Sequence, residues 1–306
     1  MRIIFIGSAS IALPTLDKLI SNDNYDVVGV ISQPDRPSGR KRLLKSSPVK
    51  ILASIHGIKV ITPENLNDDK IYNQLRILKP DLFVVIAYGN FIPKKVISLA
   101  KFKAINLHPS LLPKYRGASP IQWALMNGDD ETGVTIITVS EIMDAGNILN
   151  QKKLKIKLND TTLSLSERCS QEGANLIIKT IEDIISGSVN PIVQDEKKVI
   201  NTRKLVKSDG VINWNKTAEK INNQIKAFNP WPGSYCQLST GETLSIWEAV
   251  CVDGNGKPGE ILDDILTIST KKGAIRLLEV QLHGKKRMKT DLFLNGNKLE
   301  AGSFLI

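Results

Sequence analysis

The feature that most constrains the fold is an alternation of uninterrupted aliphatic runs with segments of helical apolar spacing. Strands that are buried on both faces read as continuous Val/Ile runs, whereas half-exposed strands alternate apolar and polar residues. The pattern therefore predicts an α/β protein with a Rossmann-like, mainly parallel sheet covered by helices on both faces. The runs span residues 2–7, 25–31, 57–63, 81–89 and 102–109.

The second half of the chain follows a different pattern. Residues 134–140 and 147–156 predict two strands joined by a turn, and residues 161–187 predict a long helix. A polar, broken segment then precedes a further helix at residues 213–228. From Trp231 onward, short apolar runs separated by Gly, Asp and Asn are typical of a small β-barrel, here expected to be OB-like.

These patterns divide the chain into three parts. We expect a catalytic domain over residues 1–189, a linker over 190–208 and an OB-like C-terminal domain over 209–306. A chain of 306 residues is long enough for two domains, each with its own core.

The net charge and the cysteines indicate what kind of partner the protein has and in which compartment it works. The formal net charge of +10 and the sequence pI of about 9.4 indicate a polyanionic partner such as a nucleic acid. The three cysteines are far apart and form no C-x-x-C motif, so we expect reduced thiols in a cytoplasmic protein. No apolar run is long enough to cross a bilayer, and the N-terminus predicts no signal or transit peptide.

A site is expected where the parallel strands end, because ligands of such sheets bind beyond the carboxyl ends of the strands. The fourth run ends at Tyr88 and Gly89, and the fifth ends at Asn106-Leu107-His108. The first turn, at Gly7, lacks the G-x-G-x-x-G pattern, and the chain contains no P-loop, so a dinucleotide or nucleoside triphosphate site is poorly supported.

The side chains of the Asn-x-His pair are of types that can take part in catalysis. Side chains two residues apart on a strand share a face, so Asn106 and His108 can face one pocket. An amide N–H can donate to a developing oxyanion, and an imidazole can donate or move a proton near neutral pH. The alternative is that Asn106 caps a turn and His108 is merely packed. Asp144, in the sequence Met-Asp-Ala-Gly, is either a turn residue or a carboxylate partner for the imidazole.

The stretches INLHPSLLPKYRGASPIQWALMNGDDETGVTI (105–136) and MDAGNIL (143–149) resemble the 10-formyltetrahydrofolate-dependent formyltransferases. Within that group the resemblance to the methionyl-tRNA formyltransferases covers nearly the whole chain. It includes the basic loop after the second run and the stretches at residues 193–218 and 227–236. One difference lies in the first turn, where the family has a Gly-Thr-Pro-like sequence before an aromatic residue and this chain has Gly7-Ser8-Ala9-Ser10-Ile11.

The resemblance implies formyl transfer from 10-formyltetrahydrofolate to the α-amine of initiator methionyl-tRNA, by a monomer that needs no metal and binds no membrane. It implies that Asn106, His108 and Asp144 are catalytic. The residues expected to contact the folate are Tyr88, Gly89, Ser110, Leu111, Leu112 and Pro113.

Two basic clusters predict contacts with tRNA phosphates. Between residues 35 and 50 there are six cations and one acid, Asp35; the expected contacts are Arg36, Arg40, Lys41, Arg42 and Lys45. The second cluster, in the C-terminal part, comprises Lys285, Lys286 and Arg287. A solvated charge run remains the alternative for both clusters. His56 and His283 have no partnering pattern and are interpreted as structural or surface groups.

Other functions fit part of this pattern. Amino-sugar nucleotide formyltransferases and formyl-folate hydrolases share the Asn/His/Asp set but have no RNA to hold, so the basic loop counts against them. Glycinamide ribonucleotide formyltransferases are usually single domains. An RNA-binding protein with a vestigial pocket would fit the basic clusters, and the intact Asn106, His108 and Asp144 set counts against it.

Overall fold

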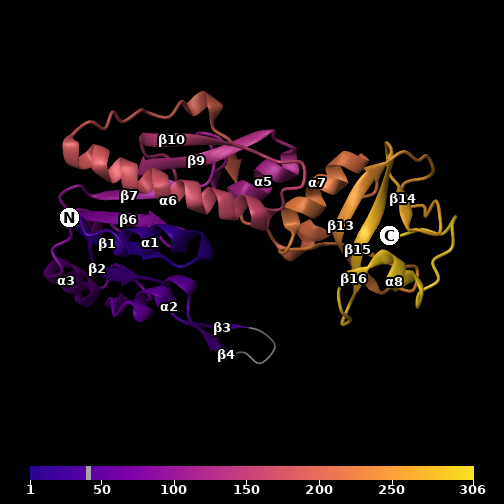
Figure 1. Ribbon diagram of the computed structural model, residues 1–306, viewed down its shortest axis with the longest axis horizontal. Helices are drawn as coiled ribbons and strands as arrows, with labels where there is room; N and C mark the ends of the chain where they lie inside the picture. The colour runs from indigo at the N-terminus through magenta and orange to yellow at the C-terminus, as the bar shows by residue number, and fades with distance from the viewer. Residues whose placement is uncertain (39–42) are drawn as a thin grey trace. The chain divides into compact units, whose positions relative to one another are not determined.

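The computed structural model describes residues 1–38 and 43–306, and these fall into two compact units (Figure 1). The first unit comprises residues 1–117, 132–154 and 166–201, and the second comprises 118–131, 155–165 and 202–306. Within the described residues, no helix has both the length and the apolar character needed to span a membrane.

The first unit is built on a seven-stranded sheet with the order β10-β9-β7-β6-β1-β2-β5. Strands β1, β2, β5, β6 and β7 run parallel to one another, and β9 is antiparallel to β7. The Rossmann-like, mainly parallel sheet is therefore confirmed. The strands are β1 (Arg2–Gly7), β2 (Asp26–Ile31), β5 (Val60–Ile61), β6 (Leu82–Ile86), β7 (Ala104–His108), β9 (Glu131–Thr138) and β10 (Ile148–Lys155).

Local sequence signals set the helices around this sheet. Ser47 caps the helix that follows it by accepting from the Lys50 N–H, with Pro48 at the first helical position, and Asp68 caps the next by accepting from Lys70. Gly173 allows the long helix to approach β7, because a Cβ there would lie 2.2 Å from a methyl of Leu107. The helices are α1 (Leu13–Ile20), α2 (Pro48–Ile55), α3 (Asp69–Ile77), α4 (Lys94–Ile97) and α6 (Thr162–Ser186).

The first turn, which departs from the family pattern, has a structural role. A Cβ at Gly7 would lie 2.7 Å from the carbonyl oxygen of Ile86, so glycine permits the close approach of β1 to β6. Ser8 Oγ accepts from the Gln33 N–H at 3.0 Å and lies 3.3 Å from Ser32 Oγ. The serine therefore ties the turn to the end of β2.

Two short pairs of strands flank the sheet. β3 (Arg36–Ser38) and β4 (Leu43–Lys45) form a hairpin after β2 and stand away from the central sheet in Figure 1. β8 (Arg116–Gly117) pairs with β11 (Asn201–Thr202), which the sequence placed in a linker.

The second unit contains an antiparallel sheet with the order β12-β13-β15-β14, with β16 paired to β15. Ile221 and Ile225 of α7 pack against Ile246 and Val280 in its core. A separate antiparallel domain after the parallel sheet is thus confirmed. The elements are α5 (Pro120–Asn127), α7 (Ala218–Phe228), β12 (Ser234–Gln237), β13 (Thr243–Val252), β14 (Thr267–Ser269), β15 (Ala274–Leu282), β16 (Met288–Lys289) and α8 (Thr290–Leu294).

Candidate active site

His108 is the last residue of β7 and is 5% exposed. Its Nε2 lies 2.8 Å from the carbonyl oxygen of Tyr115. Since a carbonyl oxygen only accepts, Nε2 carries a proton and donates it to Tyr115. Tyr115 has a left-handed backbone (φ 64°), which the following turn requires to bring its carbonyl back to the imidazole.

Asp144 comes to the same place from the loop between β9 and β10. Its Oδ2 lies 3.5 Å from His108 Nδ1 and accepts from the Gly117 N–H at 2.9 Å. The aspartate side chain is 15% exposed, and its backbone is left-handed (φ 54°). The sequence prediction that this carboxylate faces the imidazole agrees with the geometry.

Asn106 lies two residues before His108 on β7 and is half-buried. Among the described residues, its side-chain amide has no protein hydrogen-bond partner. A half-buried amide without a partner is available to a ligand, whereas a structural asparagine would be bonded to the chain.

The loop Ser110-Leu111-Leu112-Pro113 is held by hydrogen bonds from side chains of β9 and β10. Thr135 Oγ1 donates to the Ser110 carbonyl at 2.6 Å and accepts from the Leu112 N–H at 3.2 Å. Gln151 Nε2 donates to the Leu112 carbonyl at 3.0 Å. The Ser110 and Leu112 side chains are buried, while Leu111 and Pro113 are half-buried. Any ligand surface on this loop therefore comes chiefly from Leu111, Pro113 and the backbone.

The end of the neighbouring strand β6 is also tied in place. Gln33 Nε2 donates to the Tyr88 carbonyl at 2.6 Å, and Gly89 has a left-handed backbone (φ 80°). Tyr88 is buried, and this burial raises the pKa of its phenol.

A set of residues that the sequence does not mark supports the Asp144 loop. Gln194 Nε2 donates to the carbonyls of Asp144 and Gly146, each at 2.7 Å, and Gln194 Oε1 accepts from Arg116 Nε at 2.9 Å. Gln194 lies 50 residues after Asp144 in a polar segment, and no local pattern in the sequence marks it.

Five of the residues predicted to contact tRNA belong to the part of the chain that the structure describes. Arg36 and Lys45 are exposed and face each other across the β3–β4 hairpin, and Arg36 pairs with Glu64 at 3.0 Å. Arg40, Lys41 and Arg42 lie outside the described residues. In the second unit Lys285 and Lys286 are exposed, while Arg287 pairs with Glu279 and lies over the Trp247 ring at 5.1 Å.

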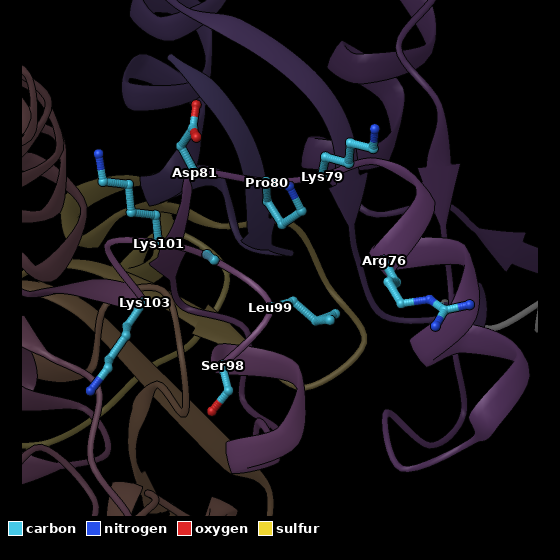
Figure 2. Close-up of a pocket in the computed structure, with 9 residues that line it drawn as sticks. Arg76, Lys79, Pro80, Asp81, Ser98, Leu99, Lys101 and Lys103 are labelled. Carbon is cyan, nitrogen blue, oxygen red and sulfur yellow. The ribbon is translucent and has the colours of Figure 1, made fainter.

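A basic cavity of about 650 Å³ lies elsewhere on the first unit, at the strand starts (Figure 2). It is lined by the residues just before β6 and β7, whereas His108 ends β7. Figure 2 shows Lys79, Lys101 and Lys103 pointing in different directions around it, so they do not converge on one ligand atom. This cavity is not the predicted catalytic site. Over the described residues, no three His, Cys, Asp or Glu side chains group as metal ligands would.

Comparison with known proteins matches two family models to the chain. The family model described as "Formyl transferase" matches residues 1–181, and "Formyl transferase, C-terminal domain" matches residues 204–298. A methionyl-tRNA formyltransferase of Bacillus cytotoxicus is 40% identical over 308 residues, covering 99% of this chain and 98% of that protein. The one of Lachnospira eligens is 40% identical over 315 residues, covering 100% and 99%.

Solved structures share the fold at lower identity. The N-formyltransferase of Helicobacter canadensis, solved with folinic acid and dTDP-3-aminofucose, has a TM-score of 0.67 at 24% identity, covering 90% of this chain and 99% of that one. HypX of Aquifex aeolicus, solved with tetrahydrofolic acid, has a TM-score of 0.65 at 18% identity. That match covers 100% of this chain and 50% of HypX.

Both halves of the chain match the family, and relatives at 40% identity extend over nearly its full length. The chain belongs to the formyl transferase family.

Proposed function

We propose that this protein transfers a formyl group from 10-formyltetrahydrofolate to the α-amine of initiator methionyl-tRNA. The observation that carries the proposal is the approach of the Asp144 carboxylate to His108 at the end of β7. The same strand carries Asn106, whose side-chain amide has no hydrogen-bond partner among the described residues. Relatives at 40% identity bear the name methionyl-tRNA formyltransferase and cover 98% or more of their own length in the match, which supports the same acceptor here.

The hydrogen bonds of His108 assign roles to its two nitrogens. Nε2 is fixed on the Tyr115 carbonyl at 2.8 Å and serves to orient the ring. Nδ1 lies 3.5 Å from the Asp144 carboxylate, longer than an ordinary N–H···O bond, so it is not committed to that partner. Because Nε2 carries a proton, Nδ1 is an acceptor in the neutral ring and a donor only in the imidazolium, whose charge the Asp144 carboxylate would balance.

When the neutral amine attacks the formyl carbon, negative charge develops on the formyl oxygen. As the tetrahedral intermediate collapses, the bond from that carbon to the folate nitrogen breaks; the amine loses a proton and the departing folate nitrogen gains one. Asn106 supplies one donor for the formyl oxygen, and Nδ1 of His108 supplies the second in its imidazolium form. Donors held by the fold before the reaction need no reorganisation, which is why such pairs accelerate acyl transfer.

The folate supplies the activated formyl group, and the strand ends fit a flat heterocycle. Leu111 and Pro113 are half-buried on a loop that Thr135 and Gln151 hold in place. Tyr88 and Gly89, at the end of β6, offer backbone groups near the same edge of the sheet. We assign these residues to folate binding, together with Ser110 and Leu112 through their backbone.

Two basic clusters hold the tRNA in this proposal, with Arg36, Arg40, Lys41, Arg42 and Lys45 in one and Lys285, Lys286 and Arg287 in the other. The division into a catalytic domain (1–189), a linker (190–208) and a tRNA-binding domain (209–306) remains part of the proposal. The protein acts as a monomer in the cytoplasm, where its charged tRNA is made and used.

The test is a formylation assay with the purified chain, 10-formyltetrahydrofolate and initiator tRNA charged with methionine. We expect formylmethionine on the RNA, and a loss of about a hundredfold or more in kcat for His108→Ala. His56→Ala is the matched control and should keep wild-type turnover, because His56 is an exposed helix-terminal residue. Formylation of a dTDP-amino sugar, but not of the charged tRNA, would contradict the proposal.

A further inference from the structure

The segment from Ile192 to Thr202, here called the strap, runs alongside the candidate active site. At one end Ile192 exchanges two backbone hydrogen bonds with Ile148, both at 2.8 Å. Toward the other end, the Arg116 N–H donates to the Ile200 carbonyl at 2.8 Å. The strap is therefore fastened both to the strand after Asp144 and to the loop after His108.

Gln194 lies between these two attachments and is 5% exposed. Its amide nitrogen donates to the carbonyls of Asp144 and Gly146, each at 2.7 Å, and its oxygen accepts from Arg116 Nε. Both N–H groups and the carbonyl are thus used. A buried polar group with all its bonds made fixes its neighbours, since any movement leaves a bond unmade.

Arg116 completes the network and is also 5% exposed. Its guanidinium holds both carboxylate oxygens of Glu196, at 2.8 and 3.2 Å. Its two chain neighbours bind the candidate catalytic pair, because the Tyr115 carbonyl accepts from His108 and the Gly117 N–H donates to Asp144. Arg116 therefore links the strap to the backbone groups that orient both side chains.

We infer that Gln194 is a positioning residue that sets the direction of the Asp144 carboxylate by holding the backbone of its loop. Asp144 has a left-handed backbone (φ 54°), and Gln194 ties the carbonyls of residues 144 and 146 on either side of Ala145. Without these two hydrogen bonds, fewer contacts keep the Asp144 loop in the position that directs Oδ2 toward His108 Nδ1.

The kinetic part of this inference rests on the proposed function, and a displacement of about 1 Å in a catalytic group can cost about a hundredfold in rate. We expect Gln194→Met to lower kcat by about tenfold to a hundredfold, with little change in KM for folate or tRNA. Gln194→Glu keeps an acceptor for the Arg116 guanidinium and turns the two donors into an oxygen that faces the carbonyls of Asp144 and Gly146, so it should show at least the same loss of kcat. Val193→Ala is the matched control, because the Val193 side chain is 77% exposed in the same strap.

A second measurement does not depend on activity. The chain has three histidines, so the ring resonances of His108 can be assigned by NMR with His56→Gln and His283→Gln. In Gln194→Glu these resonances should move toward those of Asp144→Asn. In a double-mutant cycle, Gln194→Glu should cost little further activity once Asp144→Asn is present.

The outcomes separate the two proposals. If the wild type formylates no methionyl-tRNA, the proposed function fails, while the NMR comparison still tests the strap. If wild type is active and a folded Gln194→Glu keeps both wild-type kcat and unchanged His108 resonances, the positioning role is overturned. A lower melting temperature with unchanged kcat and resonances would likewise reduce Gln194 to a structural residue.

Discussion

At the scale of single residues, the site depends on backbone conformations that residues other than glycine rarely adopt. Tyr115 and Asp144 both lie in the left-handed region, at φ 64° and 54°. Such positions cost free energy, of the order of 1–3 kcal/mol each, and persist where the surroundings hold them. Here the holding groups are the His108 imidazole on Tyr115 and the Gln194 amide on Asp144.

Asn106 offers a test that separates catalysis from stability. Because its side-chain amide bonds no other described residue, Asn106→Ala removes no protein hydrogen bond. We expect kcat to fall about a hundredfold, as for the loss of one oxyanion donor, while the melting temperature stays within a few degrees of wild type. A clear loss of stability with intact turnover would assign Asn106 to structure instead.

Gly146 tests the packing of the Asp144 loop. A Cβ at residue 146 would lie 1.7 Å from the carbonyl oxygen of Thr138, so Gly146→Ala must displace the loop. We expect a loss of about 2 kcal/mol or more in the free energy of unfolding together with a large loss of kcat. Gly296→Ala is the control, since a Cβ there meets nothing within 4 Å, and it should be neutral in both denaturant melts and turnover.

At the scale of elements, residues that the sequence assigns to loops prove to be fastened by specific side chains. The short helix η3 (Lys207–Gly210) illustrates this in the second unit. Asp209 accepts from the Val206 N–H at 2.7 Å and from both terminal nitrogens of Arg203. The hydrogen bonds from Arg203, followed by that from Val206, hold the pKa of Asp209 below its usual range despite its partial burial.

This pKa shift predicts a pH dependence of stability. A carboxyl group whose pKa is lower in the folded state adds stability above its unfolded pKa of about 3.9, and that stability is lost as the pH falls through the folded pKa. We expect Asp209→Asn to be about 1 kcal/mol less stable than wild type at pH 7, since Arg203 is half exposed and solvent weakens the pair. The gap should close as the pH falls below about 4. Urea melts at pH 7 and pH 3 measure it, and a gap that widened in acid would contradict the assignment.

At the scale of the whole molecule, the net charge of +10 is the property that bears on tRNA. Paired cations contribute less to binding a polyanion than free ones, and the structure separates the two kinds. Arg287 is paired with Glu279, whereas Lys286 is exposed with no side-chain partner among the described residues.

This distinction predicts different effects on tRNA affinity. Lys286→Ala should weaken binding and reduce the slope of log K against log salt by about 1, as for the loss of one phosphate contact. Arg287→Ala should change the slope less, because the charge of Arg287 is already balanced by Glu279. Filter binding of initiator tRNA across a salt series gives both slopes, and equal slopes for the two variants would contradict the distinction.

The sequence by itself determined the parallel sheet, because continuous aliphatic runs between helical segments are stable only when buried on both faces. It also placed Asn106 and His108 at the end of β7, since strand period and strand end are local properties. The resemblance of its motifs to a family added Asp144. The sequence did not predict the support for Asp144, which comes from Gln194 and Arg116 through hydrogen bonds across 50 and 78 residues of chain. Only the tertiary structure decided that support, because hydrogen bonds between distant segments follow from how the chain packs and leave no periodic trace in the sequence.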